Sequence, residues 1–172
     1  GKRIPVSLVY RKGFEKNGTA ALLQYGYGSY GASMDPGFSV TNVSLLDRGM
    51  VYAIAHIRGG QEMGRGWYDD GKMFNKKNTF TDFIDVTRFL VAEGYAAKDR
   101  VAAYGGSAGG LLMGAISNMA PQDYGAIVNL VEGLPGLVVR NPDGSRDVSL
   151  ALAAAREFRQ DINDMNASLT YA

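Results

Sequence analysis

The residues of this chain that could do chemistry centre on one serine in a glycine-rich segment. Gly105-Gly106-Ser107-Ala108-Gly109-Gly110 contains the pattern G-x-S-x-G. An apolar segment, 101–104, precedes it, and a helix-forming segment, 108–119, follows it. A serine between a strand and a helix is typical of a nucleophile elbow, which performs acyl transfer. We therefore expect Ser107 to be a catalytic nucleophile, with an incidental serine at a glycine-rich junction as the alternative.

The physical demands of such an elbow explain its glycines. The turn is sharp and strained, so the positions beside the serine must avoid a clash between a Cβ atom and the adjoining strand or helix. The turn also lifts the Ser107 hydroxyl above the sheet and directs the first amides of the helix toward it. The N–H of Ala108, at the positive end of the helix dipole, can then stabilise an oxyanion.

A second glycine cluster follows an earlier apolar segment. Gly26-Tyr27-Gly28-Ser29-Tyr30-Gly31 matches G-x-G-x-x-G, the form of a dinucleotide-binding loop. That function requires a helix to begin at the third glycine, and Asp35-Pro36-Gly37 interrupts any such helix. The favoured interpretation is a loop at the carboxyl end of a strand that supplies a second oxyanion donor.

Alternating strand-like and helix-like segments must position these two loops. Strands are expected over 4–10, 19–25, 50–57, 101–104 and 126–131, with helices from Asn78-Thr79 to Gly94 and from Ala108 to Met119. This order predicts an α/β fold with a mostly parallel sheet and flanking helices. Beyond it, 133–136 is expected to break the chain. A turn at 141–144 and an amphipathic helix over 148–165 are expected to follow.

Composition restricts the classes of function. The 172 residues are 46% hydrophobic, enough for a globular core, and 18 Lys plus Arg against 17 Asp plus Glu leave a net charge of +1. Nucleic acid is therefore not an expected partner. The chain has no cysteine and one histidine, which excludes a thiol nucleophile and makes a metal cluster improbable, so no cofactor is expected. Without a signal peptide or an apolar span, no membrane association is expected and the expected location is cytoplasmic.

Five segments together carry a family resemblance. They are 25–31, Ile57-Arg58-Gly59-Gly60, Gly64-x-x-Trp67, Lys76-Lys77-Asn78-Thr79-Phe80-x-Asp82-Phe83 and Gly105–Leu112. In this order and spacing they resemble the prolyl oligopeptidase family of serine peptidases, and within it the oligopeptidase B group, which cleaves after Arg or Lys. The resemblance covers about residues 1–130. It implies the amino-terminal, truncated part of an α/β-hydrolase catalytic domain, with residues 131–172 as a divergent tail.

The resemblance also implies roles for individual residues. Ser107 would be the nucleophile, and the hydroxyl of Tyr27 would stabilise the oxyanion together with the Ala108 amide. Tyr30 matches an aromatic position that lines the substrate pocket, and Asp35 matches an acidic position that binds basic substrates. The implied partner is a peptide substrate.

The expected site lacks a base. The family's catalytic Asp and His lie far downstream of the serine, and this sequence departs from the family pattern after about residue 129. Its one histidine, His56, falls inside the strand expected over 50–57, where a structural, hydrogen-bonded imidazole is expected. The chain alone is therefore predicted to be inactive or nearly so, because a serine hydroxyl without a base is a poor nucleophile.

Two alternatives stay open at this point. One is another serine hydrolase with the same elbow, an esterase or an acylaminoacyl-releasing enzyme. The other is a non-catalytic fragment that binds another chain, or self-associates, through an uncovered sheet edge. The basic cluster Lys72, Lys76 and Lys77 is expected to be a solvated face.

Overall fold

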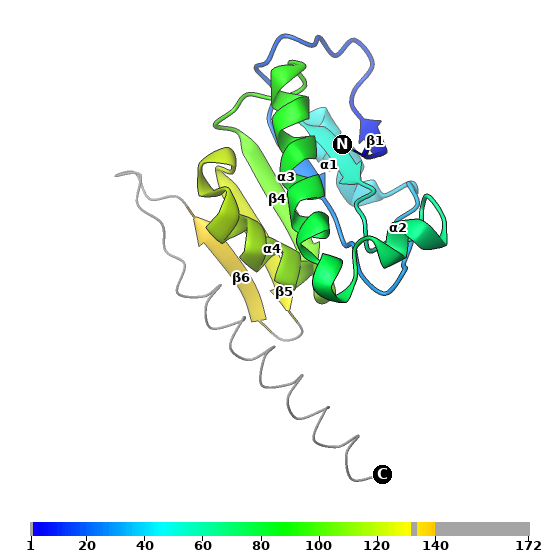
Figure 1. Cartoon of the computed structure of the whole chain (residues 1–172). Coiled ribbons are helices and arrows are strands. Elements are labelled where there is room, and N and C mark those ends of the chain that lie inside the picture. The colour runs from blue at the N-terminus through cyan, green and yellow to red at the C-terminus, as the bar shows by residue number, and fades with distance from the viewer. Residues whose placement is uncertain (1, 132–133, 140–172) are drawn as a thin grey trace.

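The computed structural model describes residues 2–131 and 134–139, and its centre is a six-stranded sheet (Figure 1). The strands are β1 (Val6–Val9), β2 (Leu22–Tyr25), β3 (Val51–Ala55), β4 (Val101–Gly106), β5 (Ala126–Val131) and β6 (Leu134–Val139). Their spatial order is β1-β3-β2-β4-β5-β6. The four inner strands are parallel, and the two edge strands run antiparallel to their neighbours. The predicted α/β class with a mostly parallel sheet is confirmed.

Helices cover both faces of this sheet. The helices are α1 (Val40–Asp47), α2 (Arg65–Asp69), α3 (Lys77–Ala92) and α4 (Ala108–Met119), with short 3-10 turns at Met73–Asn75 and Pro121–Asp123. Parallel strands joined by right-handed crossovers place a helix on one face when the chain moves one way and on the other face when it reverses. The chain moves from β2 to β3 through α1, then back past β2 to β4 and β5 through α3 and α4. Figure 1 accordingly shows α3 and α4 together on one face and α1 behind the sheet.

The main core lies between the inner strands and the helix pair α3 and α4. Apolar side chains alternate along the strands, so that every second residue faces these helices. Fully buried members include Leu22, Val51, Phe83, Leu90, Leu112 and Ile116. This packing holds the carboxyl ends of β2 and β4 side by side at a fixed separation.

The predicted elements agree with the structure except in four places. Helix α3 begins at Lys77, and no side chain caps its first amides, so the expected Asn78-Thr79 cap is wrong. The sequence analysis did not predict α1 or α2. Helix α1 has no buried residue and α2 is five residues long, so neither produces the periodic apolar pattern that indicates a helix.

The chain break expected at 133–136 is also wrong, because residues 134–136 lie in strand β6. Pro135 and Gly136 are both unfavourable in an inner strand. Strand β6 pairs only with β5 and lies at the edge, where a proline has no ladder bond to lose on its outer side. The turn at 141–144 and the helix over 148–165 lie outside the described residues, and the domain boundary at residue 130 stays a prediction.

Within the described part of the chain, no helix is both long enough and apolar enough to cross a membrane.

Candidate active site

Ser107 stands at a strained turn between β4 and α4. It has φ 53° and ψ −122°, a region that costs an L-residue energy, and it is the residue immediately before the first turn of α4. Its side chain is exposed, and its carbonyl oxygen accepts a hydrogen bond from the Gly110 N–H at 2.7 Å. The strain keeps the hydroxyl above the carboxyl end of the sheet, as expected for a nucleophile elbow.

Two glycines make this turn sterically possible. A Cβ atom on Gly105 would lie 2.5 Å from the Gly109 carbonyl oxygen and 3.2 Å from the Met113 Cε. A Cβ atom on Gly109 would lie 3.1 Å from the Gly26 carbonyl oxygen. At Gly105 the strand and the helix therefore approach each other more closely than a Cβ atom would allow, which is the reason inferred from the sequence for this glycine, and at Gly109 a Cβ atom would crowd the loop after β2.

The Tyr27 loop, residues 26–31, lies against this elbow. Its strand β2 is the neighbour of β4, and the Gly26 N–H donates to the Tyr104 carbonyl oxygen at 3.3 Å. A Cβ atom on Gly109, in the first turn of α4, would lie 3.7 Å from the Tyr27 Cδ2. The two loops that the sequence analysis singled out thus share the point where the direction of the strand order reverses, where open α/β sheets bind their ligands.

The expected site residues other than Asp35 lie near Ser107. Tyr27 is half-buried and Ala108 is buried, both beside Ser107 in space or in sequence. Tyr30 is 74% exposed, with its ring centroid 6.4 Å from that of Tyr27. The nucleophile, both oxyanion candidates and one substrate candidate therefore lie at one end of the sheet.

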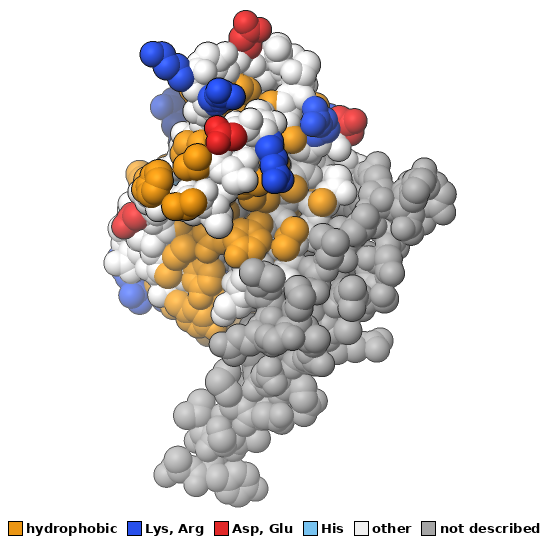
Figure 2. Space-filling view, turned by 180° about the vertical axis from the view of Figure 1, so that it is seen from behind, with side chains coloured by type: hydrophobic (Ala, Val, Ile, Leu, Met, Phe, Trp, Pro, Cys, Tyr) orange, Lys and Arg blue, Asp and Glu red, His pale blue; other side chains and the backbone are white. Residues whose placement is uncertain are grey.

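Asp35 has a different setting from these residues. It is exposed and lines a cavity of about 470 Å³, together with Tyr25, Tyr52 and Tyr104, on the sheet face that carries α1. Apolar side chains also gather on the side turned away from α3 and α4 (Figure 2). No contact within the described residues joins Asp35 to Tyr27 or Ser107, so its substrate-binding role stays a prediction.

Lys76 fixes the Tyr27 loop from the side of α3. Its Nζ donates to the Gly28 carbonyl oxygen at 2.5 Å and to the Ser29 Oγ at 2.8 Å. Burial lowers the pKa of this ammonium to about 8. The expectation that Lys76 belongs to a solvated face is wrong, and no apolar or charge pattern in the sequence signals its true position.

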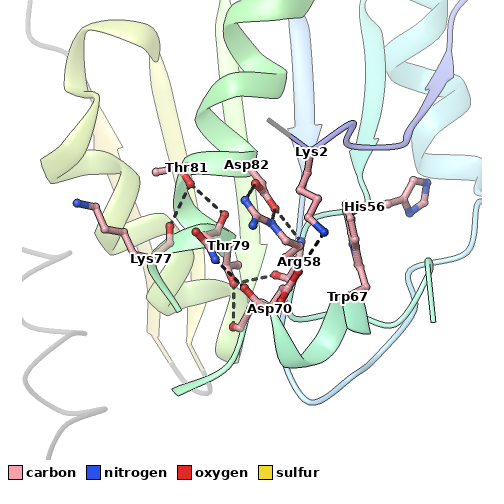
Figure 3. Close-up of polar contacts among 11 residues, drawn as sticks. Lys2, His56, Arg58, Trp67, Asp70, Lys77, Thr79, Thr81 and Asp82 are labelled. Carbon is pink, nitrogen blue, oxygen red and sulfur yellow. Dashed lines mark hydrogen bonds and ion pairs between the residues drawn. The ribbon is translucent and has the colours of Figure 1, made fainter. Parts of the chain in front are cut away.

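The next turn of α3 fixes the loop after β3. The Asp82 carboxylate accepts from the Arg58 Nε at 2.8 Å and from the Arg58 backbone N–H at 3.1 Å, and the Thr79 hydroxyl donates to the Arg58 carbonyl oxygen at 2.7 Å (Figure 3). The hydrogen bond that the Arg58 guanidinium donates to the Asp82 carboxylate raises the pKa of Arg58. Gly59 in turn accepts from the Gly31 N–H at 3.0 Å. The α3 amino terminus therefore supports the Tyr27 loop both directly and through Arg58.

His56 lies away from Ser107, just after β3, which ends at Ala55, so its expected place inside the strand is wrong. It is 7% exposed, its Nε2 lies 2.8 Å from the Ser7 Oγ on edge strand β1, and its Nδ1 lies 3.6 Å from the Glu62 Oε1. In Figure 3 its imidazole points away from the Arg58–Asp82 pair. Strand β2 separates the end of β3 from β4, a spacing of about 10 Å. These contacts agree with the expected buried, hydrogen-bonded imidazole.

No cluster of three or more His, Cys, Asp or Glu side chains converges as a metal site within 2–131 and 134–139.

A strained serine at the switch point of a mostly parallel sheet, beside the loop after the neighbouring strand, is the arrangement of the α/β-hydrolase class. The sequence model of the Prolyl oligopeptidase family matches residues 36–132, more than half of the chain. The chain belongs to this family.

Several relatives are similar to this chain over three-quarters of its length. Dipeptidyl aminopeptidase BI of Pseudoxanthomonas mexicana is 77% identical over 129 residues, 75% of this chain and 18% of that protein. Protease 2 of Moraxella lacunata is 51% identical over 131 residues, 76% of this chain and 19% of that protein. The solved structure of oligopeptidase B from Leishmania major is 48% identical, with a TM-score of 0.72, and is matched over 74% of this chain and 18% of its own. The chain thus spans less than a fifth of the length of these relatives.

Proposed function

We propose that this chain forms the nucleophile and oxyanion part of a serine peptidase active site. Ser107 is the nucleophile, and the Ala108 N–H and the Tyr27 hydroxyl are the oxyanion donors. The observation that carries the proposal is the close approach of the Tyr27 loop to Gly109 in the first turn of α4, where an added Cβ atom would lie 3.1 Å from the Gly26 carbonyl oxygen, beside a strained and exposed serine. Membership in the prolyl oligopeptidase family supports the same assignment.

The proposed reaction is acyl transfer from a peptide to Ser107, followed by hydrolysis. The Ser107 Oγ bonds to the carbonyl carbon of the substrate while its proton passes to a base, and the resulting oxyanion accepts hydrogen bonds from Ala108 and Tyr27. The C–N bond then breaks, and the leaving amine takes up the proton. Water attacks the acyl-enzyme in the same way and releases the acid.

The base for these steps comes from outside the 172 residues in this proposal. The chain's single histidine, His56, is buried against Ser7 and Glu62 two strands away from Ser107. Without a base, only the small residual acceleration from the oxyanion donors and from binding is expected. The isolated chain should therefore react slowly at Ser107.

We propose peptides with Arg or Lys before the cleaved bond as substrates. The exposed carboxylate of Asp35 would bind the basic side chain, and the exposed ring of Tyr30 would line the pocket. The name of the relative that is 77% identical favours a second candidate, removal of dipeptides from a peptide's amino terminus. The two candidates differ in whether a free amino terminus two residues before the cleaved bond is needed.

Chemical rescue of the missing base tests the proposal on the chain itself. A fluorophosphonate probe phosphonylates an activated serine: the Oγ–P bond forms, fluoride leaves and the base takes the proton. We expect slow labelling, mapped by mass spectrometry to Ser107, that imidazole in solution accelerates. The Tyr27→Phe variant should label about tenfold to a hundredfold more slowly in imidazole, because one oxyanion donor is lost.

Tyr10→Phe is the control, because it removes an exposed phenol hydroxyl at the opposite end of the sheet, which has no role in the proposal. A labelling rate that does not change with imidazole, or that is equal in Tyr27→Phe and wild type, would contradict the proposal. Rapid stoichiometric labelling without imidazole would show instead that the chain contains its own base.

A further inference from the structure

We propose that Lys76 is a positioning residue, which holds the Tyr27 loop in the conformation that directs the Tyr27 hydroxyl toward Ser107. This inference rests on the proposed function. Lys76, which directly precedes α3, does not itself touch the reacting atoms.

The Gly28 carbonyl oxygen belongs to a buried residue and requires a hydrogen-bond donor. A Cβ atom on Gly59 would lie only 2.0 Å from this oxygen, so the turn after β3 packs directly against it. A Cβ atom on Gly28 itself would lie 2.4 Å from the Thr79 Cγ2, so the Cα of this residue is also closely packed. Among the described residues, no backbone N–H in a turn or loop donates to this oxygen, and the Lys76 Nζ does so at 2.5 Å. A buried carbonyl without a partner would destabilise the loop.

Lys76 also binds a second group of the same loop. The Ser29 hydroxyl, in a residue that is 9% exposed, lies 2.8 Å from the Lys76 Nζ. Gly28 and Ser29 directly follow Tyr27, so one ammonium group fixes the backbone on the carboxyl side of the phenol-bearing residue. On the amino side of Tyr27, the Gly26 N–H donates to the Tyr104 carbonyl oxygen at 3.3 Å and ties the loop to β4.

Lys76 occupies a position that is unfavourable for a cation by every local criterion. It lies at the amino terminus of α3, where the helix dipole is positive and where the first turn has no acidic residue. It is half-buried, and within the described ranges no carboxylate oxygen lies within ion-pair distance of its Nζ. A residue that breaks local rules in this way is expected at a functional site, where another requirement outweighs the local cost.

Hydrogen exchange of the loop amides tests the positioning directly, on the full 172-residue chain. The Gly31 N–H bonds to the Gly59 carbonyl and the Ala32 N–H to the Ser29 carbonyl, so both amides report the closed loop. We expect Lys76→Met to speed their exchange about tenfold or more, since a charge-assisted hydrogen bond to a buried carbonyl is lost. The Leu22 and Ala97 amides at the other end of the sheet should not change.

Three further variants distinguish the role of Lys76 from a general loss of stability. Lys77→Met is the matched control, because Lys77 is the next residue and its side chain is exposed. The Gly31 and Ala32 amides should exchange in this variant as they do in wild type. Lys76→Arg keeps the charge and the donors and should restore most of the protection. If Lys76→Met does not fold, Ser29→Ala removes only one of the two acceptors and should loosen the loop in the same direction.

Imidazole-rescued labelling of Ser107 shows whether Lys76 acts through Tyr27. Lys76→Met should slow labelling about tenfold in the wild-type background and have little effect in the Tyr27→Phe background, because the two residues act as one unit. Equal slowing in both backgrounds would overturn the positioning role, as would unchanged exchange of Gly31 and Ala32 in Lys76→Met. Failure of the proposed function has a different signature, which is that Tyr27→Phe alone labels at the wild-type rate.

Discussion

At the scale of single residues, the site depends on groups in energetically unfavourable states. Ser107 has a positive φ, and Lys76 is a half-buried cation at a helix amino terminus. Neither state improves stability by itself. Both bring polar groups to one end of the sheet, where a peptide carbonyl could be bound.

The lowered pKa of Lys76 predicts a specific dependence of stability on pH. Burial lowers this pKa from 10.5 in the unfolded chain to about 8 in the folded protein. Between these two values the unfolded state binds more protons, so the free energy of unfolding should rise as the pH rises from 8 toward 10. The slope should not exceed that of one proton per molecule. Above pH 10, tyrosines whose pKa is raised by burial, Tyr25 and Tyr52, act in the opposite direction.

Urea unfolding at pH 7.5, 8.5 and 9.5 measures this effect. Wild type and Lys77→Met should both gain stability over this range, and Lys76→Met should lack the gain. A gain of the same size in Lys76→Met would mean that another group titrates. The neutral amine still has hydrogens to donate to Gly28 and Ser29, so the loop contacts themselves should persist at pH 9.5.

The sequence predicted some of these residues and missed others for identifiable reasons. Ser107 and Tyr27 belong to short motifs whose glycines are visible in the sequence and necessary for the turn. Lys76 directly precedes helix α3 and Asp82 lies on it, and their partners Gly28 and Arg58 are 48 and 24 residues away along the chain. Only the packing of α3 against the loops after β2 and β3 brings them together, and no local pattern encodes that packing.

At the scale of secondary structure elements, the close packing of α4 on β4 controls the geometry of the elbow. The buried apolar residues of α4 and the inner strands predicted this contact, and the elbow glycines reduce its spacing. Edge elements were predicted less well. Strand β6 carries a proline and a glycine that usually end a strand, and only its edge position makes it possible.

Two glycine-to-alanine substitutions in this region should have opposite effects. Gly105→Ala should destabilise the chain by about 1–3 kcal/mol, because its Cβ would lie 2.5 Å from the Gly109 carbonyl oxygen. Gly114→Ala, inside α4, should stabilise it by about 0.5–1 kcal/mol, since its Cβ meets no atom within 4 Å and alanine favours the helix.

Urea unfolding monitored by circular dichroism measures both changes. A neutral Gly105→Ala variant with normal labelling of Ser107 would show that α4 can move away from β4 without cost. That result would remove the steric basis for the elbow.

At the scale of the whole molecule, residues 2–131 and 134–139 are built around one sheet whose carboxyl end carries the candidate site and whose two edge strands are β1 and β6. The inner strands are covered by α3 and α4 on one face, and the switch point between β2 and β4 lies near the centre of the sheet. Its relatives are more than five times as long as the matched region, so the base, the peptide selectivity and the partners of the complete protein stay proposals. Self-association through a sheet edge likewise stays a prediction.

The most direct test of the central claim is a crystal structure of the chain phosphonylated at Ser107. The account predicts that the phosphoryl oxygen lies about 3 Å from both the Ala108 nitrogen and the Tyr27 hydroxyl oxygen. A phosphoryl oxygen that points into solvent, with the Tyr27 hydroxyl bonded elsewhere, would contradict it.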